Sequence, residues 1–304
     1  MNPEVAVVGG GPAGIATAIQ LKRYDLEPLL FEKDRLGGLL WNAHRVENYP
    51  GFPKGIPGPG LIERFKSQLE FNQVSVVYEK VNTIDYDKSK QAFSLLTGSG
   101  AYSADIVVAA TGTKPKTAGL LESVPEKLKE KLFFEISPII NGNTKEKEKK
   151  IIIIGAGDIA FDYALNLAGF NEVIIIHRST EIKALPLLKR KIQGNKNIRF
   201  IGSSTLEKVE KGKSKALNAA FVKNGKDCMT MEVDYIVGAI GREPQRDFYT
   251  DNLWDMEEYL VSRGRLYFAG DVKNDHFRQV AIAVGSGIET AMKIQQKWLI
   301  SQVE

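Results

Sequence analysis

The amino-acid sequence predicts an α/β protein with two parallel sheets in two domains, the second domain inserted into the first. Three observations support this prediction. Apolar runs without polar alternation, typical of strands buried on both faces of a parallel sheet, precede two glycine-rich turns, in residues 4–14 and 151–160. Each half also has a later strand that ends in a G-x-x-P segment, at residues 112–115 and 241–244. Two such crossings indicate a chain that leaves its first domain and returns to it.

The first glycine-rich turn follows the apolar run Val5–Val8 and holds three glycines at G-x-G-x-x-G spacing. In this fingerprint the first glycine allows a tight turn, the second lets a pyrophosphate approach the backbone, and the third lets helix and strand pack closely. The helix that follows is expected to face the phosphates with its N-terminus. We therefore predict a dinucleotide site here, rather than a structural glycine turn, formed by Gly9, Gly11, Pro12, Ala13 and Gly14.

The second glycine-rich turn follows the apolar run 151–154. Gly155, Gly157 and Ala160 repeat the spacing, with alanine permitted in the third place. A helix is expected from Ile159 to about residue 168. The fold class is therefore α/β with two Rossmann-like (three-layer) nucleotide-binding domains, the second inserted into the first. We expect the first domain at residues 1–114 and 245–304, and the second at 115–244.

The residue that ends the next strand differs between the two halves. Glu32 lies 32 − 9 = 23 residues after Gly9, and Arg178 lies 178 − 155 = 23 residues after Gly155. A carboxylate at this place holds a ribose hydroxyl pair and repels a 2′-phosphate, whereas a guanidinium grips such a phosphate. The second site is therefore expected to prefer NADP(H) to NAD(H), with Lys183 as a further positive charge. The alternative is that Arg178 merely lies on the surface.

The remaining pattern predicts further strands and two more helices. Strands are expected at residues 28–31, 74–78, 92–96, 102–109, 173–176, 198–201, 206–210, 216–222, 229–233, 235–240 and 265–269. Helices are expected at residues 61–71 and 280–299. The segments 46–60 and 117–150 are expected to be loops, and residues 245–264 give no assignment.

Composition bounds the possible functions. The chain has 304 residues, 43% of them hydrophobic, with a formal charge of +4 and a pI near 8.9, so nothing demands nucleic acid as a partner. No apolar run approaches the roughly 20 residues that span a bilayer. Cys228 is the single cysteine and cannot form an internal disulfide, and the first strand leaves no room for a signal peptide. We expect a cytoplasmic protein without a membrane partner.

The motifs resemble the low-molecular-weight thioredoxin reductases and their relatives, the thioredoxin-reductase-like ferredoxin:NADP reductases, over nearly the whole chain. The likeness to the FAD half of that family lies in residues 9–14, 37–38, 46–53 (VENYPGFP), 110–112, 270–272 and 278–279. The resemblance implies that Glu32 holds the adenosine ribose and that Asp271 reaches the ribityl and pyrophosphate region. Arg278 and Gln279 are then expected beside the flavin. Further FAD contacts are implied at Gly38, Leu39, Asn48, Thr111, Gly112, Gly270 and Val280.

The second half resembles the NADPH half of the same family. Its implied NAD(P)H contacts are Gly155, Gly157, Asp158, Ile159, His177, Arg178, Lys183 and Gly241. Ser179 stands where the family commonly has a second arginine. The family also implies a homodimer, and an inserted domain that rotates about the two G-x-x-P crossings to bring NADPH to the flavin.

One departure from thioredoxin reductases decides the mechanism. Those enzymes carry a C-x-x-C pair shortly before the second glycine-rich turn, where this chain reads FFEISPIIN at residues 133–141. A dithiol relay requires two sulfurs, so the usual thioredoxin reductase mechanism is excluded. We expect Cys228 in a turn, as an ordinary small residue. The ferredoxin reductase branch also lacks the dithiol, but usually extends past the last helix with an aromatic cover for the flavin, whereas this sequence ends at Glu304.

Three functions follow as hypotheses. The first is an FAD-dependent oxidoreductase that passes electrons from NADPH or NADH to ferredoxin or another small redox protein, attracted by the basic residues Lys189, Arg190, Lys191, Lys196 and Arg199. A solvated surface explains these basic residues at least as well. The second is a disulfide or quinone reductase acting directly from flavin, and the third is a non-catalytic flavoprotein sensor.

Hydride transfer needs no protein acid or base, because the cofactors do the chemistry and the protein positions them. We therefore predict no catalytic residue and no metal site. His44, His177 and His276 lack a partner that the sequence could identify, and each is expected to be structural or cofactor-adjacent. His276, close to Arg278, is the first candidate for mutation.

Overall fold

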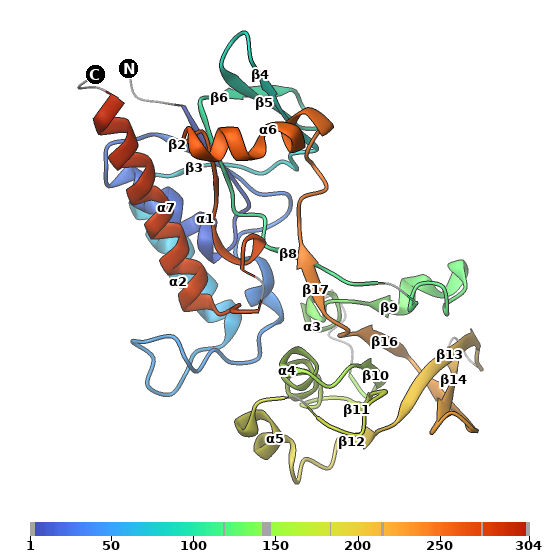
Figure 1. Ribbon diagram of the computed structural model, residues 1–304. Coiled ribbons are helices and arrows are strands. Elements are labelled where there is room, and N and C mark those ends of the chain that lie inside the picture. Colours follow the sequence, from blue (N-terminus) through green and yellow to red (C-terminus); the bar gives the residue numbers. More distant parts are fainter. Residues whose placement is uncertain are drawn as a thin grey trace. The chain divides into compact units, whose positions relative to one another are not determined.

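The computed structural model describes residues 4–117, 119–141, 147–182, 184–213, 216–274 and 276–301. It is a mixed α/β protein, as predicted, and its chain forms two compact units (Figure 1). Unit 1 comprises Met1–Trp41, Val46–Lys114 and Glu243–Glu304. Unit 2 comprises Pro115–Arg242 together with the short segment Asn42–Arg45, which the sequence analysis assigned to the first domain. Within the described ranges, no helix has the length and apolar character to cross a membrane, and the compartment stays a prediction.

Unit 1 is built on a five-stranded parallel sheet in the order β18-β7-β1-β2-β3. Its strands are β1 (Val5–Val8), β2 (Pro28–Phe31), β3 (Ser75–Val77), β7 (Ile106–Ala109) and β18 (Leu266–Phe268). Every residue of the central strands β1 and β7 is buried. The uniformly apolar runs in the sequence are explained by this burial on both faces.

Two helices lie side by side on unit 1, α1 (Pro12–Lys22) and α7 (Val280–Ser301), as Figure 1 shows. Thr17 joins them, because its hydroxyl contacts the carbonyl oxygens of Ala13 at 2.8 Å and Gly287 at 3.1 Å. Gly287 permits this approach, since a Cβ there would overlap the Ala13 carbonyl oxygen. The helix α2 (Gly58–Phe71) and the short 3-10 helices η1 (Gly38–Asn42) and η3 (Gly270–Val272) belong to the surrounding connections.

A second layer of unit 1 is the antiparallel sheet β4-β5-β6 with helix α6. Its elements are β4 (Thr83–Asp87), β5 (Ala92–Leu96), β6 (Ala101–Ala104) and α6 (Asp251–Ser262). Ile84 and Phe93 of this layer share a buried cluster with Val8 and Phe31 of the parallel sheet and with Leu253 of α6. The apolar cluster therefore joins both chain ends of unit 1.

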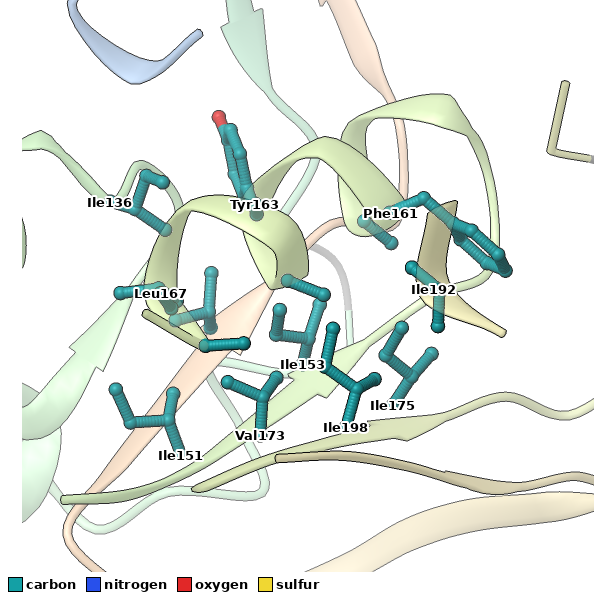
Figure 2. Close-up of a cluster of buried hydrophobic side chains, with 14 of the residues drawn as sticks. Ile136, Ile151, Ile153, Phe161, Tyr163, Leu167, Val173, Ile175, Ile192 and Ile198 are labelled. Carbon is teal, nitrogen blue, oxygen red and sulfur yellow. The ribbon is translucent and has the colours of Figure 1, made fainter. Parts of the chain in front are cut away.

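Unit 2 has its own five-stranded parallel sheet, in the order β12-β11-β10-β16-β9. Its strands are β9 (Leu132–Phe133), β10 (Lys150–Ile154), β11 (Glu172–Ile176), β12 (Ile198–Ile201) and β16 (Tyr235–Gly238), and its helices are α3 (Ser137–Asn141), α4 (Asp158–Leu167) and α5 (Pro186–Ile192). Figure 2 shows Phe161 and Leu167 of α4 packed over Ile153 and Ile175 of the sheet. The helices thus cover one face.

The other face of this sheet packs on the antiparallel sheet of β13 (Ser204–Lys211), β14 (Leu217–Lys223) and β15 (Asp227–Val233). Ile152 and Ile174 share a buried cluster with Val209, Leu217 and Phe221. Unit 2 therefore has three layers, as expected for a Rossmann-like domain.

The chain passes between the units through two short paired strands, β8 (Thr113–Pro115) and β17 (Arg242–Pro244). Gln245 donates its backbone N–H to the Gly112 oxygen at 3.0 Å, and Lys116 donates to the Gly241 oxygen at 2.9 Å. Partner numbers fall on one strand as they rise on the other, so the pair is antiparallel. The two G-x-x-P segments therefore lie side by side.

Several predicted elements need correction. Residues 117–150 are not one loop, because they contain the 3-10 helix η2 (Glu126–Lys131) as well as β9 and α3. The unassigned stretch 245–264 contains α6, and the single strand expected at 102–109 is the two strands β6 and β7. Helix α2 begins at Gly58, inside the expected loop. Cys228 lies in β15 and is exposed, so its placement in a turn was wrong.

Candidate nucleotide-binding sites

The carboxyl ends of four strands of unit 1 meet at one edge of its parallel sheet. β1 leads into Gly9, β2 into Glu32, β7 into Ala110 and β18 into Ala269. The connections diverge here, because β1 is flanked by β2 on one side and by β7 on the other. Open α/β sheets bind ligands in the crevice at such a switch point. The geometry of unit 1 therefore gathers the predicted FAD residues where a ligand site is expected.

The three glycines of the first turn have different structural duties. Gly9 has φ +112°, and a Cβ there would overlap the Ala110 carbonyl oxygen. A Cβ on Gly14 would overlap the carbonyl oxygen of Gly9, so the fold requires both glycines. Gly11 instead has extended backbone, with φ −77° and ψ −179°, and a Cβ there would meet nothing within 4 Å. Open space at the start of α1 fits a pyrophosphate.

Glu32 is fixed beside this turn. Glu32 is 8% exposed, and each oxygen of its carboxylate accepts one backbone hydrogen bond. Gly10 donates to Oε2 at 2.8 Å, and Asp34 donates to Oε1 at 3.0 Å. A carboxylate can accept about four hydrogen bonds, so acceptor capacity remains for hydroxyl groups. The geometry suits the ribose-holding role expected of Glu32.

The turn at Gly37 and Gly38 lies against the first glycine-rich turn. Gly37 donates its N–H to the Gly10 oxygen at 2.8 Å. Gly38 has φ +54°, and a Cβ on it would lie 3.3 Å from Cα of Gly11. A side chain at Gly38 would therefore crowd the space beside Gly11, and the half-buried Leu39 follows directly.

The C-terminal part of the candidate FAD site reaches the same edge. Gly270 has φ +74°, and a Cβ there would lie 2.6 Å from the Ala13 Cβ, so this turn approaches the start of α1 closely. Ser286 of α7 holds the turn, because its Oγ accepts the Gly270 N–H at 3.0 Å. The half-buried Asp271 follows in η3.

Two further predicted FAD segments are joined directly. Asn48 donates through Nδ2 to Oε1 of Gln279 at 2.8 Å, so the VENYPGFP loop meets the segment before Val280. Arg278 donates through Nε to the Asn274 oxygen at 3.1 Å. At the exit of β7, the Thr111 hydroxyl donates to the Gln245 oxygen at 2.7 Å, and Gly112 has φ +64°.

Unit 2 repeats the glycine-rich turn at the end of β10. Gly155 has φ +131°, and a Cβ on it would overlap the carbonyl oxygen of Ala239, just beyond β16. Gly157 is the extended N-cap of α4, and a Cβ there would meet nothing within 4 Å. Ala160 is fully buried, which explains the small residue in the third place. Asp158 and the exposed Ile159 form the first turn of α4. The space beside Gly157 again fits a phosphate.

The ends of the neighbouring strands supply the other predicted NAD(P)H residues. β11 leads into His177, which is 7% exposed, and into the exposed Arg178. A Cβ on Gly202 would lie 3.3 Å from Cε1 of His177, so β12 packs closely on this ring. Gly241, with φ +114°, follows β16. Lys183 lies outside the described residues. The structure therefore brings the predicted residues of β10 and β11 to one sheet edge.

The remaining candidates have more ordinary surroundings. Lys189 donates to the Ile182 oxygen at 2.6 Å, and Arg199 pairs with Glu172, so both of these basic residues have structural partners. His44 and His276 are exposed.

Ser286, Gly10 and Leu185 take part in these candidate sites but were not among the residues predicted from the sequence. Ser286 holds the Gly270 turn, the Gly10 N–H holds Glu32, and the Leu185 N–H binds Asp158 at 2.8 Å. Only Leu185 had a signal, since the following Pro186 is typical of a helix start. The other two bonds depend on pairs that are distant in sequence.

Two units of this kind, one inserted into the other, define a flavoprotein class with separate sites for two dinucleotides. Residues 3–287 match the family described as pyridine nucleotide-disulphide oxidoreductase, and the chain belongs to that family. It is an enzyme of the thioredoxin reductase type within the family, and proteins of this type bind FAD and use NAD(P)H.

The relatives match over nearly their full lengths. The thioredoxin reductase of Chlamydia pneumoniae is 29% identical over 311 residues, covering 97% of this chain and 99% of the relative. That of Buchnera aphidicola is 30% identical, covering 96% and 95%. Among solved structures, Lactococcus lactis thioredoxin reductase in its FR conformation has a TM-score of 0.83 at 24% identity, covering 97% of this chain and 99% of that one. The bacillithiol disulfide reductase of Staphylococcus aureus has a TM-score of 0.73 at 17% identity, covering 98% and 99%.

Proposed function

We propose that this protein passes electrons from NADPH or NADH through FAD to an external acceptor, without an internal dithiol. One observation carries the proposal. The stretch 133–141 holds no cysteine, and the single cysteine of the chain, Cys228, lies in β15. An internal disulfide needs two sulfurs, so the electrons must leave by another route. A small redox protein such as ferredoxin is the acceptor we favour.

The residues of unit 1 fit an FAD molecule. Gly11 and the start of α1 would take the pyrophosphate, the fixed Glu32 carboxylate would take the adenosine ribose, and Asp271 would reach the ribityl and pyrophosphate region. Arg278 and Gln279 would lie beside the flavin ring. The flavin supplies two-electron chemistry, and the protein orients it and excludes water.

The residues of unit 2 fit a nicotinamide dinucleotide. Gly157 and the start of α4 would take the pyrophosphate, and the exposed Arg178 would take the 2′-phosphate of NADPH. Hydride transfer requires no proton donor, and we assign that role to none of the three histidines.

A second candidate function is the reduction of a disulfide directly from flavin. The relatives that are about 30% identical carry the name thioredoxin reductase, which favours a disulfide acceptor. A quinone is the further alternative. In each case the acceptor would have to bring its own reducible group, because this chain supplies no second thiol.

The test is anaerobic mixing of the yellow protein with NADPH or NADH while the flavin absorbance is followed. Bleaching and then reoxidation by ferredoxin supports the favoured function. Turnover only with thioredoxin, a low-molecular-weight disulfide or a quinone supports the second. A flavin that neither nucleotide bleaches would contradict both proposed functions and would leave the non-catalytic flavoprotein sensor as the remaining hypothesis.

The homodimer implied by the family is part of the proposal, and sedimentation of the purified protein tests it.

A further inference from the structure

The carboxylate of Asp158 binds the far end of the loop that carries Arg178. Its Oδ1 accepts the backbone N–H of Leu185 at 2.8 Å, across a sequence separation of 27 residues. Asp158 is the first residue of α4, directly after Gly157. Leu185 is the residue that caps the N-terminus of α5. One hydrogen bond therefore joins the glycine-rich turn of unit 2 to the start of the next helix.

The loop between β11 and α5, of which the structure describes residues 177–182 and 184–185, is held at its other end by the turn after β12 and the first residue of β13. Ser204 donates its N–H to the His177 oxygen at 3.0 Å, and Ser203 donates to the Ser179 oxygen at 3.3 Å. Near Leu185, the side chain of Ala184 is buried in the core of unit 2. Arg178 thus sits in a loop anchored on both sides, while its own side chain is exposed.

A carboxylate at this position needs an explanation. An acidic residue in the first turn of a helix interacts favourably with the helix dipole, but the same turn is expected to hold a pyrophosphate, which a carboxylate repels. The hydrogen bond to Leu185 gives Asp158 a structural role in which it does not contact the phosphate. The bond directs Oδ1 toward the loop.

We propose that Asp158 is a positioning residue for nucleotide specificity. By holding Leu185, it fixes the loop that presents Arg178 to the 2′-phosphate of the bound nucleotide, and so contributes to a preference for NADP(H) over NAD(H). This inference rests on the proposed function of unit 2. The hydrogen-bond acceptor, and not the negative charge, is the property that matters. An amide oxygen can accept the same bond, so asparagine should substitute for it.

The experiment titrates adenosine 2′,5′-bisphosphate and AMP into the full-length protein by calorimetry, which needs no turnover. The loss of one hydrogen bond corresponds to about a three- to tenfold change in affinity. Asp158→Ala should therefore weaken the bisphosphate about three- to tenfold and AMP less than twofold. Asp158→Asn should bind both ligands within about twofold of the wild type, or more tightly because the repulsion is gone.

Leu185→Pro removes the donor instead of the acceptor. The φ of Leu185, −53°, matches proline, and its side chain is half exposed, so the helix start should tolerate the change. This variant should reproduce the loss seen in Asp158→Ala, and the double variant should lose little more than either alone. Leu185→Pro also tests the proposal if the Asp158→Ala variant fails to fold.

Three results would overturn the inference while the proposed function stands: unchanged bisphosphate affinity in Asp158→Ala, equal losses for bisphosphate and AMP, or an Asp158→Asn variant as weak as the alanine. A wild-type protein that binds neither ligand and does not oxidise NADPH or NADH would instead contradict the proposed function. The two failures are therefore distinguishable.

Discussion

A side chain on Gly11 should remove FAD without harming the fold, whereas a side chain on Gly14 should harm the fold itself. The two glycines belong to the same turn, yet a Cβ on Gly11 meets nothing within 4 Å and a Cβ on Gly14 overlaps the Gly9 carbonyl oxygen. Gly11→Val and Gly14→Ala therefore separate a glycine kept for a ligand from a glycine kept for packing. Gly11→Ala is the milder member of the first class.

The expected magnitudes follow from these surroundings. Gly11 has an extended backbone that any residue adopts, so Gly11→Ala should leave the FAD-free protein unchanged or stabilise it by about 0.4–1 kcal/mol. In Gly11→Val the branched side chain would occupy the pyrophosphate space, and losing two charge-assisted hydrogen bonds costs about 3–6 kcal/mol, or more than 100-fold in FAD affinity. Overpacking in Gly14→Ala should cost about 1–3 kcal/mol, which lowers the melting temperature by about 2–12 °C.

The assay measures the flavin-to-protein absorbance ratio of each purified variant and the melting temperature of its FAD-free form. FAD-free protein is required because bound ligand itself raises apparent stability. The reasoning is refuted if Gly11→Val retains a full complement of flavin. It is equally refuted if the FAD-free Gly11→Ala protein melts at a lower temperature than FAD-free Gly14→Ala.

Three other changes test separate parts of the structure. Arg178→Ala should raise the KM for NADPH about tenfold or more while the KM for NADH changes less than twofold, and equal effects would remove the 2′-phosphate argument. Cys228→Ser should leave kcat with any acceptor within about twofold, because this exposed thiol has no partner cysteine in the chain; a large loss would restore a role for sulfur. Asp85 accepts hydrogen bonds from Asn252 at 2.7 Å and Thr250 at 2.8 Å, which hold its pKa below the ordinary value of 3.8. The stability that the ionised carboxylate contributes is fully present at pH values above the ordinary pKa and is lost as the pH falls through the lowered pKa. Asp85→Ala should therefore reduce the urea midpoint at pH 7. The difference from the wild type should shrink as acid protonates the wild-type carboxylate.

The strands around the glycine-rich turns could be predicted because their burial leaves a direct trace in the sequence. β1 and residues 151–153 of β10 are buried and belong to unbroken apolar runs. Helix α6 could not, since only Leu253 and Leu260 of its twelve residues are buried and Trp254 and Tyr259 face outward. Leu253 and Leu260 are seven residues apart, as expected for one face of a helix, but the exposed aromatic residues obscure this periodicity in the sequence.

β4 was missed for a different reason. Its sequence TIDYD does alternate, with Ile84 and Tyr86 buried, but aspartate is rare in strands and obscured the pattern. β9 has only two residues, and its strand character comes from pairing with β16. No local pattern can reveal an element that depends on a distant partner.

The candidate sites show the same division. Glu32 could be predicted from its position at a strand end, and the structure adds the two N–H groups that hold it. The bond between Asp158 and Leu185 could not, because its donor is a backbone N–H, which every residue except proline carries. Side-chain identity therefore suggests the candidate sites, while the contacts that hold their residues in place require coordinates.

The antiparallel pairing of β8 with β17 has a consequence for how this architecture is assembled. Gly112 and Gln245 lie in unit 1, close to the points where the chain leaves it after Lys114 and re-enters it at Glu243, and a backbone hydrogen bond of 3.0 Å joins them. The polypeptide between them is therefore connected to unit 1 at two adjacent positions, as an inserted domain is. An inserted domain with closely spaced ends can be exchanged without stretching the unit that carries it, so we expect a different domain grafted at these positions to leave the folding of unit 1 intact.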